Sequence, residues 1–525
     1  MPQRNKTRQN SDALEDEALR ERLAQVLGND SVRGLARRLE LPFPTVGRYI
    51  KDGRPPASFC RKLVRELGVN PAWLLTGEGS PMLSDVPQVA SNTATGLLEL
   101  VEAMNAVAKM RLGALAGKEH LKVLRELNEA LNRYEELRAK LNKHSRPVFR
   151  MLVDQLIAIQ EERNPDKARP LLEACRQVAR LCDDPVLERD YIYHRSHYAY
   201  LAGNARESTR LLRRLVSQIL IEGERLGDEL DHAGCLWAQN LAASLRLQLQ
   251  IPEASQIAEA SLLFVPAAVR KTPGYHALLM QAALGDIELG RLRRARERLT
   301  RLLPDIAEGN YRAFMALPFL ALANALSGSA GFEEAKVSCA HDATHILALI
   351  AMWNENGAQL DETVTLGGHY RGPATPVFAH TALFVSAVTR ARRGERLTTL
   401  LGTVDDSLAK FAGHESLEEY RTYVAPVVKT QCALLAGDHK RAMTLFLQAN
   451  DALRAAPRGI SLPVVYAALH HRNAIRLSAG PAGTSGSRRK ALKHAREQAL
   501  KFFRRHIKAG YAVFRSALEE TRAPA

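Results

Sequence analysis

The chain has 525 residues, which is too long for one compact hydrophobic core and favours several domains or a core that grows by repetition. Its residues are 46% hydrophobic but only 6% aromatic, which is typical of helical proteins and disfavours a β-sandwich or barrel. The formal net charge of +16 predicts an acidic partner, of which nucleic acid is the commonest for a soluble protein. The sequence therefore predicts an all-α protein.

Residues 1–15 are polar throughout and predict a disordered N-terminus rather than a secretion signal. No run of 18 apolar residues occurs, so we expect no membrane-spanning segment and no membrane partner. The six cysteines are scattered without a Cys-x-x-Cys pair, which favours buried thiols in a reducing compartment. We therefore expect a cytoplasmic, nucleoid-associated protein.

Residues 16–82 predict the first domain, which consists of five short helices. Apolar residues recur at helical spacing up to Gly28, where the first helix ends. Ser31 is suited to cap the second helix, and a turn at residues 40–42 leads to a third helix over about 44–50. The steep packing of two short helices requires small and branched apolar residues at their contact. The expected core residues of this helix pair are Leu35, Ala36, Leu39, Val46 and Tyr49.

One pattern within this domain resembles the helix-turn-helix of the Cro and phage-repressor class of transcriptional regulators: Leu35-Ala36-x-x-x-Glu40-x-x-x-x-x-Val46-x-x-Tyr49. Residues 70–79 are similar to the closing helix of many phage-repressor-like domains, so the resemblance covers about the first 80 residues. One departure is Glu40, because the family commonly has glycine there. A left-handed backbone at this position costs a residue with a side chain about 1 kcal/mol.

The resemblance implies that the third helix enters the major groove of duplex DNA with its N-terminal residues at the base edges. Arg48 would bond the O6 and N7 atoms of guanine together, and Gly47 would allow a close approach beside Thr45. The residues expected at phosphates are Ser31, Arg33, Lys51 and Arg54. The alternatives are a helical domain with solvated basic residues and a helix-turn-helix that contacts protein.

Residues 83–95 are small, polar and interrupted by proline, which predicts a linker. Residues 96–144 predict a helical connector whose second helix carries an apolar stripe. The stripe consists of Leu124, Leu127, Leu131, Tyr134 and Leu141. It either joins two copies of the chain in a homodimer, which would bring two DNA-binding domains to a two-fold operator, or packs on the first repeat of the region that follows.

Residues 145–475 repeat one motif, in which a helix ends near a glycine and a small residue follows five positions later, before larger apolar residues. The clearest copies are Gly290, Ala295, Leu299 and Leu302, and Gly437, Ala442, Phe446 and Ala449. The motif resembles the tetratricopeptide repeat (TPR), in which each helical hairpin buries its apolar face on the next. This resemblance implies a TPR-like α-solenoid whose groove binds a peptide or protein effector.

Residues 339–345 offer a rival chemistry, because His341 and His345 have the spacing of two zinc ligands on one helix of a peptidase. Asp342 stands where that motif has a glutamate base, but its side chain is one methylene shorter. No third ligand is evident beyond Glu362. We therefore expect no catalytic residue, no metal and no cofactor.

Residues 476–487 predict a second linker and residues 488–525 a basic C-terminal helix, which either contacts DNA phosphates or acidic partners or caps the array. The expected fold is a five-helix helix-turn-helix domain followed by a TPR-like α-solenoid. The expected function is a dimeric, non-enzymatic regulator of transcription that binds duplex DNA and an effector. The alternatives are a TPR interaction scaffold with a protein-docking helix-turn-helix and a helix-turn-helix-linked zinc peptidase.

Overall fold

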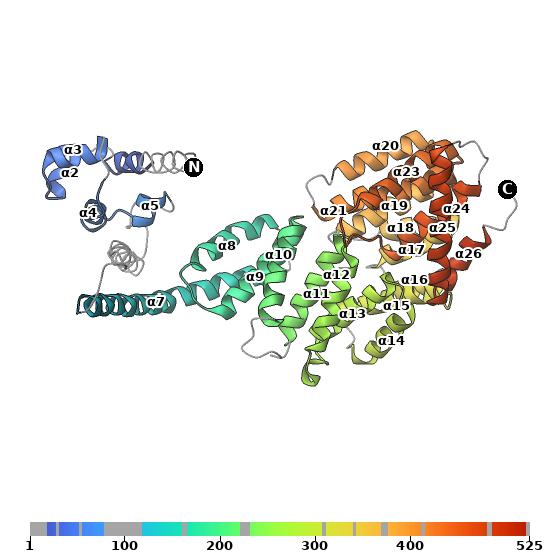
Figure 1. The fold of residues 1–525 in the computed structure, drawn as a ribbon, viewed down its shortest axis with the longest axis horizontal. Coiled ribbons are helices and arrows are strands. Elements are labelled where there is room, and N and C mark those ends of the chain that lie inside the picture. The colour runs from blue at the N-terminus through green and yellow to red at the C-terminus, as the bar shows by residue number, and fades with distance from the viewer. Residues whose placement is uncertain are drawn as a thin grey trace. The chain divides into compact units, whose positions relative to one another are not determined.

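The computed structural model describes residues 18–27, 31–51, 55–77, 118–159, 165–220, 231–306, 311–339, 343–368, 376–410, 415–479 and 486–520. The regular elements within these ranges are helices, which confirms the all-α prediction (Figure 1). No helix in the same ranges is both long and apolar enough to cross a membrane. The chain divides into two compact units, the first comprising Met1–Leu152 and Ala174–Pro185 and the second Val153–Glu173 and Val186–Ala525.

The first unit begins with a bundle of five short helical segments. Residues 18–27 are helical, and α2 (Val32–Arg38), α3 (Phe43–Lys51), α4 (Ala57–Leu67) and α5 (Pro71–Thr76) follow. The bundle closes over a core of buried apolar side chains, among them Leu23, Leu35, Leu39, Val46, Phe59, Leu63, Val69 and Leu74. These segments therefore share a core of their own, which we call the N-terminal bundle.

The long helix α7 (Lys118–Ala158) crosses the boundary at residues 144 and 145, which the sequence placed between the connector and the array. The end of the predicted connector and the start of the predicted array are therefore one helix. Of the apolar stripe, Leu131 is exposed and Leu141 half-buried, while the side chains of Leu124, Leu127 and Tyr134 lie outside those described.

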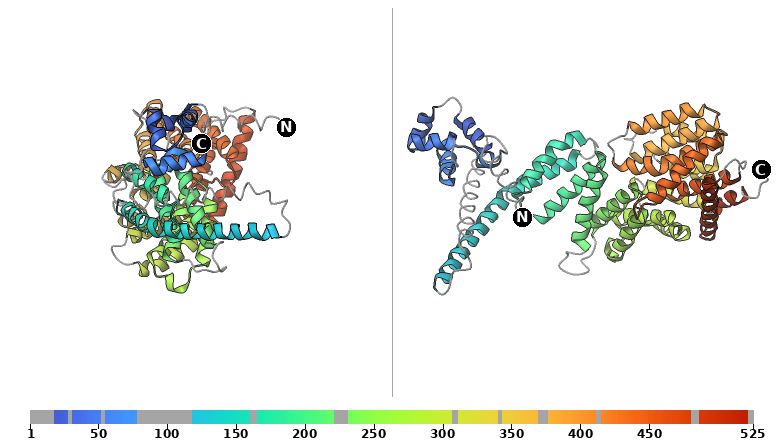
Figure 2. Two further views of the ribbon diagram at one scale, coloured as in Figure 1. Left: turned by 90° about the vertical axis from the view of Figure 1, so that its left-hand side faces the viewer. Right: turned by 45° about the horizontal axis from the view of Figure 1, so that its top comes forward.

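The second unit is a succession of helical hairpins, which Figure 2 shows from two further sides. The hairpins are α9 (Pro185–Leu201) with α10 (Ala205–Leu220), α11 (His232–Leu247) with α12 (Ile251–Leu263), α13 (Pro273–Glu288) with α14 (Leu292–Leu302), α15 (Tyr311–Ser327) with α16 (Phe332–Cys339), α17 (Thr344–Asn354) with α18 (Gly357–Gly368), α19 (Pro376–Arg392) with α20 (Leu397–Ala409), α22 (Ala425–Leu435) with α23 (His439–Ala455), and α24 (Val464–Ala479) with α25 (Ser487–Lys508). Elements outside these hairpins include α8 (Pro165–Val178), α21 (Glu415–Glu419), the π-helix η5 (Tyr420–Val424), the 3-10 helix η6 (Ala512–Phe514) and α26 (Arg515–Glu519).

The hairpins stack in two layers. From α11 onward, the first helix of each hairpin contacts the first helix of the next, so α11 packs on α13, α13 on α15, and so on to α22 on α24. The second helix of each hairpin also contacts the first helix of the hairpin that follows. Each hairpin therefore buries its apolar face on its neighbours, and we call this succession the helical array.

Seven of the hairpins turn at a residue with a left-handed backbone: Gly203, Leu249, Gly290, Gly328, Glu355, Gly394 and Gly437. Glycine serves at five of these turns because it has no Cβ to clash in this conformation. In the two clearest copies of the motif, all the small and apolar residues that follow Gly290 and Gly437 are buried. The sequence motif thus marks the turn and the inward face of these hairpins.

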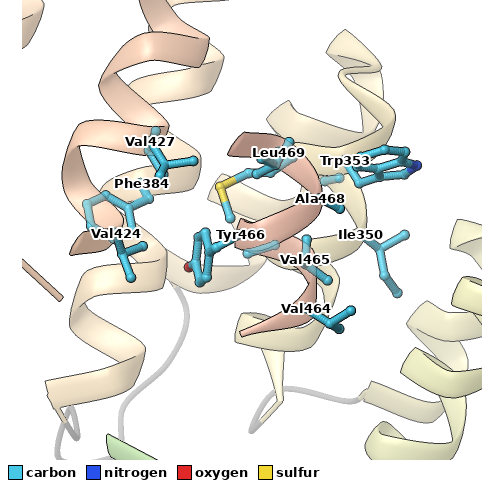
Figure 3. Packing of buried hydrophobic residues seen from close by; sticks show 14 of the residues in the cluster. Ile350, Trp353, Phe384, Val424, Val427, Val464, Val465, Tyr466, Ala468 and Leu469 are labelled. Carbon is cyan, nitrogen blue, oxygen red and sulfur yellow. The ribbon is translucent and has the colours of Figure 1, made fainter. Parts of the chain in front are cut away.

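A continuous hydrophobic core runs through the array. Figure 3 shows part of it, where Tyr466 of α24 lies near Phe384 of α19 and Val424 of η5. The rings of Phe384 and Tyr466 meet edge to face, with centroids 6.2 Å apart. Helix α24 contacts α17 as well as its neighbours α22 and α23. The last hairpin is therefore part of the core.

The C-terminal segment packs back onto much earlier hairpins. The hydroxyl group of Tyr511 donates a hydrogen bond to the carbonyl oxygen of Ile287, which lies 224 residues earlier. The backbone N–H of Val464 donates to the carboxylate of Glu288, which lies 176 residues earlier. The array is therefore more than a sequential stack along this stretch, because residues near its C-terminus contact a hairpin far earlier in the chain.

The C-terminal linker and helix differ from their predicted bounds. Helix α24 continues to Ala479, so the predicted linker at 476–487 begins within a helix, and residues 480–485 lie outside those described. Helix α25 begins at Ser487 and packs against α24. Helix α25 therefore covers the end of the array, which is one of the two roles that the sequence left open.

Candidate nucleic-acid interface

Helix α2 is capped at both ends, and a left-handed residue begins the turn to α3. Its N-cap is Ser31, whose Oγ accepts a hydrogen bond from the backbone N–H of Gly34 at 3.0 Å. Its C-cap is Leu39, and the next residue, Glu40, has a φ of 52°, which is the left-handed conformation that the family resemblance implied. The turn therefore forms without glycine.

Lys62 of α4 supports this turn from outside. Its ammonium group donates a hydrogen bond to the carbonyl oxygen of Leu39 at 2.8 Å, at the end of α2. A cation at a helix C-terminus also interacts favourably with the helix dipole. No local spacing in the sequence predicts this contact, because 23 residues separate Lys62 from Leu39.

The five residues expected in the core of this helix pair lie together. Leu35, Ala36, Leu39 and Val46 are each at most 4% exposed, and Val46 is fully buried. Tyr49 is half-buried, and its ring lies 5.0 Å from the ring of Phe59 between centroids. Helix α3 is thereby fixed against α2 and α4 along one side.

Of the three residues expected at base edges, Arg48 lies opposite the buried Val46, and Thr45 and Gly47 lie on the two flanks of α3. Arg48 is exposed, while Thr45 and Gly47 are half-buried. The guanidinium carbon of Arg48 lies 5.4 Å from the centroid of the Tyr49 ring. A Cβ added at Gly47 would meet no heavy atom within 4 Å, so the packing of this chain does not require glycine there. Because Gly47 has no side chain, the surface of α3 does not protrude at this position, beside the exposed guanidinium group of Arg48.

The residues expected at phosphates differ in their surroundings. Arg33 is exposed on α2, and its guanidinium carbon lies 5.3 Å from the centroid of the Phe43 ring at the start of α3. Lys51 is exposed at the last position of α3. The hydroxyl group of Ser31 caps α2, and Arg54 lies outside the described residues.

Three of the cations expected at DNA lack an ion pair within the described part of the N-terminal bundle. Arg33, Arg48 and Lys51 form no ion pair with any described residue. Their positive charge is therefore not neutralised by the described fold and is available to an anionic ligand.

The rival metal site does not lie on a single described helix. Helix α16 ends at Cys339 and α17 begins at Thr344, so no described helix carries both histidines of the proposed pair. His341 and Asp342 lie outside the described residues, while Cys339 is buried in the core of the array. Within the described ranges, no group of three His, Cys, Asp or Glu residues is placed to hold a metal ion.

No protein-family model matches the chain, and a search of curated proteins found no match either. The functional inference therefore depends on the residues of the chain itself.

Proposed function

We propose that the protein is a sequence-specific DNA-binding regulator of transcription, with α2 and α3 as its helix-turn-helix and α3 as the helix that enters the major groove. One observation carries the proposal. Val46 of α3 is fully buried in the N-terminal bundle. Arg48, on the opposite side of the same helix, faces solvent next to the open space at Gly47. A helix that is packed along one side and exposed along the other can lie in the major groove of duplex DNA, which is about 12 Å wide.

The roles of the residues follow from their chemistry. The guanidinium group of Arg48 can donate two hydrogen bonds to the O6 and N7 atoms of one guanine, which distinguishes that base. Gly47 lets the helix approach closely, and Thr45 lies one position before the buried Val46, near the start of α3. The proposed phosphate contacts are Ser31, Arg33, Lys51 and Arg54, which set the position of the domain without reading sequence.

The regulator is proposed to act as a homodimer, and α7 offers the contact. Leu131, Val148 and Met151 are large apolar side chains of this helix that are 43–50% exposed. Burying them against a second copy would remove apolar surface from water, and a two-fold dimer would present two copies of α3 to an inverted repeat. The helical array is proposed to be TPR-like and to bind a peptide or protein effector in the cytoplasm.

The proposal is tested by selecting duplexes from a random pool with the full-length protein, with Arg48→Ala and with Arg65→Ala. Arg65 is a matched control, because it is an exposed arginine on α4 of the same bundle and is not part of the proposed interface. We expect an inverted repeat with the wild type and with Arg65→Ala, and its loss with Arg48→Ala. Equal enrichment by all three proteins, or none by the wild type, would exclude base recognition through α3.

The dimer is tested separately by sedimentation velocity of the full-length protein and of Met151→Glu. A charged side chain in an apolar interface has to be desolvated, so the variant should sediment as a monomer at concentrations where the wild type is a dimer. A wild type that sediments as a monomer at every concentration would contradict a dimer formed by α7.

A further inference from the structure

Half of the net charge of the chain lies in one helix. The 22 residues of α25 contain nine Lys and Arg against one Glu, which gives a formal charge of +8 out of +16 for the whole chain. Charge at this density repels itself and is unfavourable unless a partner or counterions neutralise it. The placement of these side chains indicates whether the fold supplies that partner.

One face of α25 holds the helix to the array. Leu492, Ala495, Ala499 and Phe503 are buried at steps of three and four residues. The ring of Phe503 lies 6.2 Å from the ring of Trp353 in α17 between centroids. This face fixes the rotation of α25 about its axis, so the orientation of the opposite face is also determined.

The opposite face carries a row of exposed cations, which we call the basic ridge. Its residues are Lys490, Lys493, Lys501, Arg504, Arg505 and Lys508, all exposed. With 3.6 residues per turn they lie on the side away from the buried face, and from the first to the last they span about 27 Å. Glu497 falls within the same row and is its one acidic residue.

The fold supplies no partner for these charges. None of the six ridge residues forms an ion pair or a side-chain hydrogen bond with another residue in the part of the chain that the structure describes. By contrast, Arg472 and Arg476 of the adjacent helix α24 both bond the carboxylate of Glu520. The ridge is therefore set apart from the neutralised arginines of the same hairpin.

The chemistry of the ridge indicates which polyanion it fits. Proteins that hold single-stranded nucleic acid stack bases on exposed aromatic rings, but Phe502 lies against His471 and Phe503 is buried. Helices that bind a lipid surface insert large apolar side chains, and no described residue of α25 exposes one. A straight row of cations matches the backbone of a duplex, where each strand carries a phosphate about every 3.4 Å.

We propose that the basic ridge of α25 is a second DNA-contacting surface, which binds the backbone of duplex DNA without sequence preference. It does not depend on base recognition by α3. If both surfaces act, the chain contacts DNA through two sites that are covalently joined, so engagement of one raises the effective concentration of the other.

The test is the salt dependence of binding to a duplex of about 30 base pairs that lacks the selected operator. The ridge variant is full-length Lys501→Gln, Arg504→Gln and Lys508→Gln combined. Its matched control is Lys440→Gln, Arg441→Gln and Arg454→Gln, which removes three exposed cations from α23 of the same array. Both variants keep side chains that favour helices, and the unfolding midpoint of each is compared with the wild type.

The ridge variant should bind at least about tenfold more weakly near 50 mM salt, because it loses three phosphate contacts. The slope of log K against log salt should become shallower by about 2 to 3, and the control should match the wild type. In the opposite direction, Glu497→Lys completes the row and should strengthen binding and steepen the slope. Arg48→Ala should leave this non-operator slope at or within about 1 of its wild-type value.

Two results would overturn the proposal. Equal weakening of the ridge variant and the α23 control would show a general effect of net charge rather than a site. Tighter binding of single-stranded DNA or RNA than of duplex through the same residues would reject the duplex backbone as the ligand. A failure of operator selection together with an intact ridge effect would reject the proposed regulator and leave the ridge standing.

Discussion

In the helical array, Arg291, Arg294 and Arg298 all bond the carboxylate of Asp286, which is fully buried, whereas in the N-terminal bundle Arg33 and Arg48 lie beside aromatic rings and face solvent. An arginine bonded to a carboxylate is neutralised within the fold and contributes little field to the surroundings. An arginine without a carboxylate keeps its charge for a partner. Arginine thus stabilises the fold of the array, whereas in the N-terminal bundle it leaves positive charge available to a ligand.

The array repeats this use of arginine at its C-terminal end. Arg476 donates two hydrogen bonds to the carboxylate of Glu355, at 2.8 and 2.9 Å, and the neighbouring Glu520 receives bonds from Arg472 and Arg476. Gln431 also donates to Glu355 at 2.7 Å. The net charge of +16 is therefore an incomplete guide to function, because arginines such as these serve packing.

The largest effect is expected from removing the buried carboxylate of Asp286 in the array. Asp286→Ala removes the common partner of three arginines and should lower the free energy of unfolding by about 3 kcal/mol, measured by urea denaturation. Asp451→Ala serves as the control, because Asp451 is exposed on α23 and should change the free energy by less than about 0.5 kcal/mol. Equal losses in the two variants would contradict a structural role for the Asp286 cluster.

The next largest effect is expected from acid, which should destabilise the array through histidines that the N-terminal bundle lacks. Burial lowers the pKa of His470 to about 4, below the value of about 6.5 in an unfolded chain, while residues 18–77 contain no histidine. As the pH falls from about 6.5 towards 4, the unfolded array binds protons that the folded array excludes, so its stability is present above this window and declines within it. The expected loss at about pH 5 is roughly 2 kcal/mol for this histidine.

The measurement is urea denaturation of the wild type and of His470→Gln at about pH 7 and pH 5. The variant lacks the titrating group and should lose less stability between the two pH values than the wild type does. Burial also lowers the pKa of His194 to about 4 and, with weaker contributions from nearby charges, that of His471 to about 3, so part of the acid effect should remain. An identical pH dependence of both proteins would show that His470 does not contribute.

Arg48→Ala should act in the opposite sense to Asp286→Ala. Loss of one bidentate contact in each half-site of the inverted repeat should weaken binding to the selected operator by at least about thirtyfold, or about 2 kcal/mol, measured by fluorescence anisotropy. The free energy of unfolding should stay within about 0.5 kcal/mol of the wild type, because Arg48 is exposed. A loss of stability without a change in affinity would assign Arg48 to the fold instead.

The smallest effect is expected at Gly47, where a substitution should raise stability but weaken operator binding. A methyl group has open space there, so Gly47→Ala should raise the free energy of unfolding by about 0.5–1 kcal/mol through helix propensity. The same methyl group would stand at the DNA surface and should weaken operator binding. Improved stability with unchanged affinity would indicate that α3 does not approach the bases at this position.

Much of the array could be predicted because its signals are local. A glycine at a left-handed turn and a small residue five positions later mark Gly290 with Ala295 and Gly437 with Ala442 in the sequence as well as in the structure. The hairpin that turns at Glu355 was missed, since this residue adopts the same backbone without glycine. In the candidate interface, the spacing of buried residues predicted the core of the α2–α3 pair, but not the hydrogen bond from Lys62.

The sequence by itself determined the helical class, the inward faces of the clearest hairpins and the buried positions of the α2–α3 pair. These depend on periodicity and turn chemistry, which act over a few residues. Only the tertiary structure decided which arginines bond a carboxylate, that the C-terminal segment returns to Ile287 and Glu288, and that the six cations of the basic ridge face solvent. Such contacts join residues far apart in the chain, and their geometry is set by how the hairpins stack rather than by any local pattern.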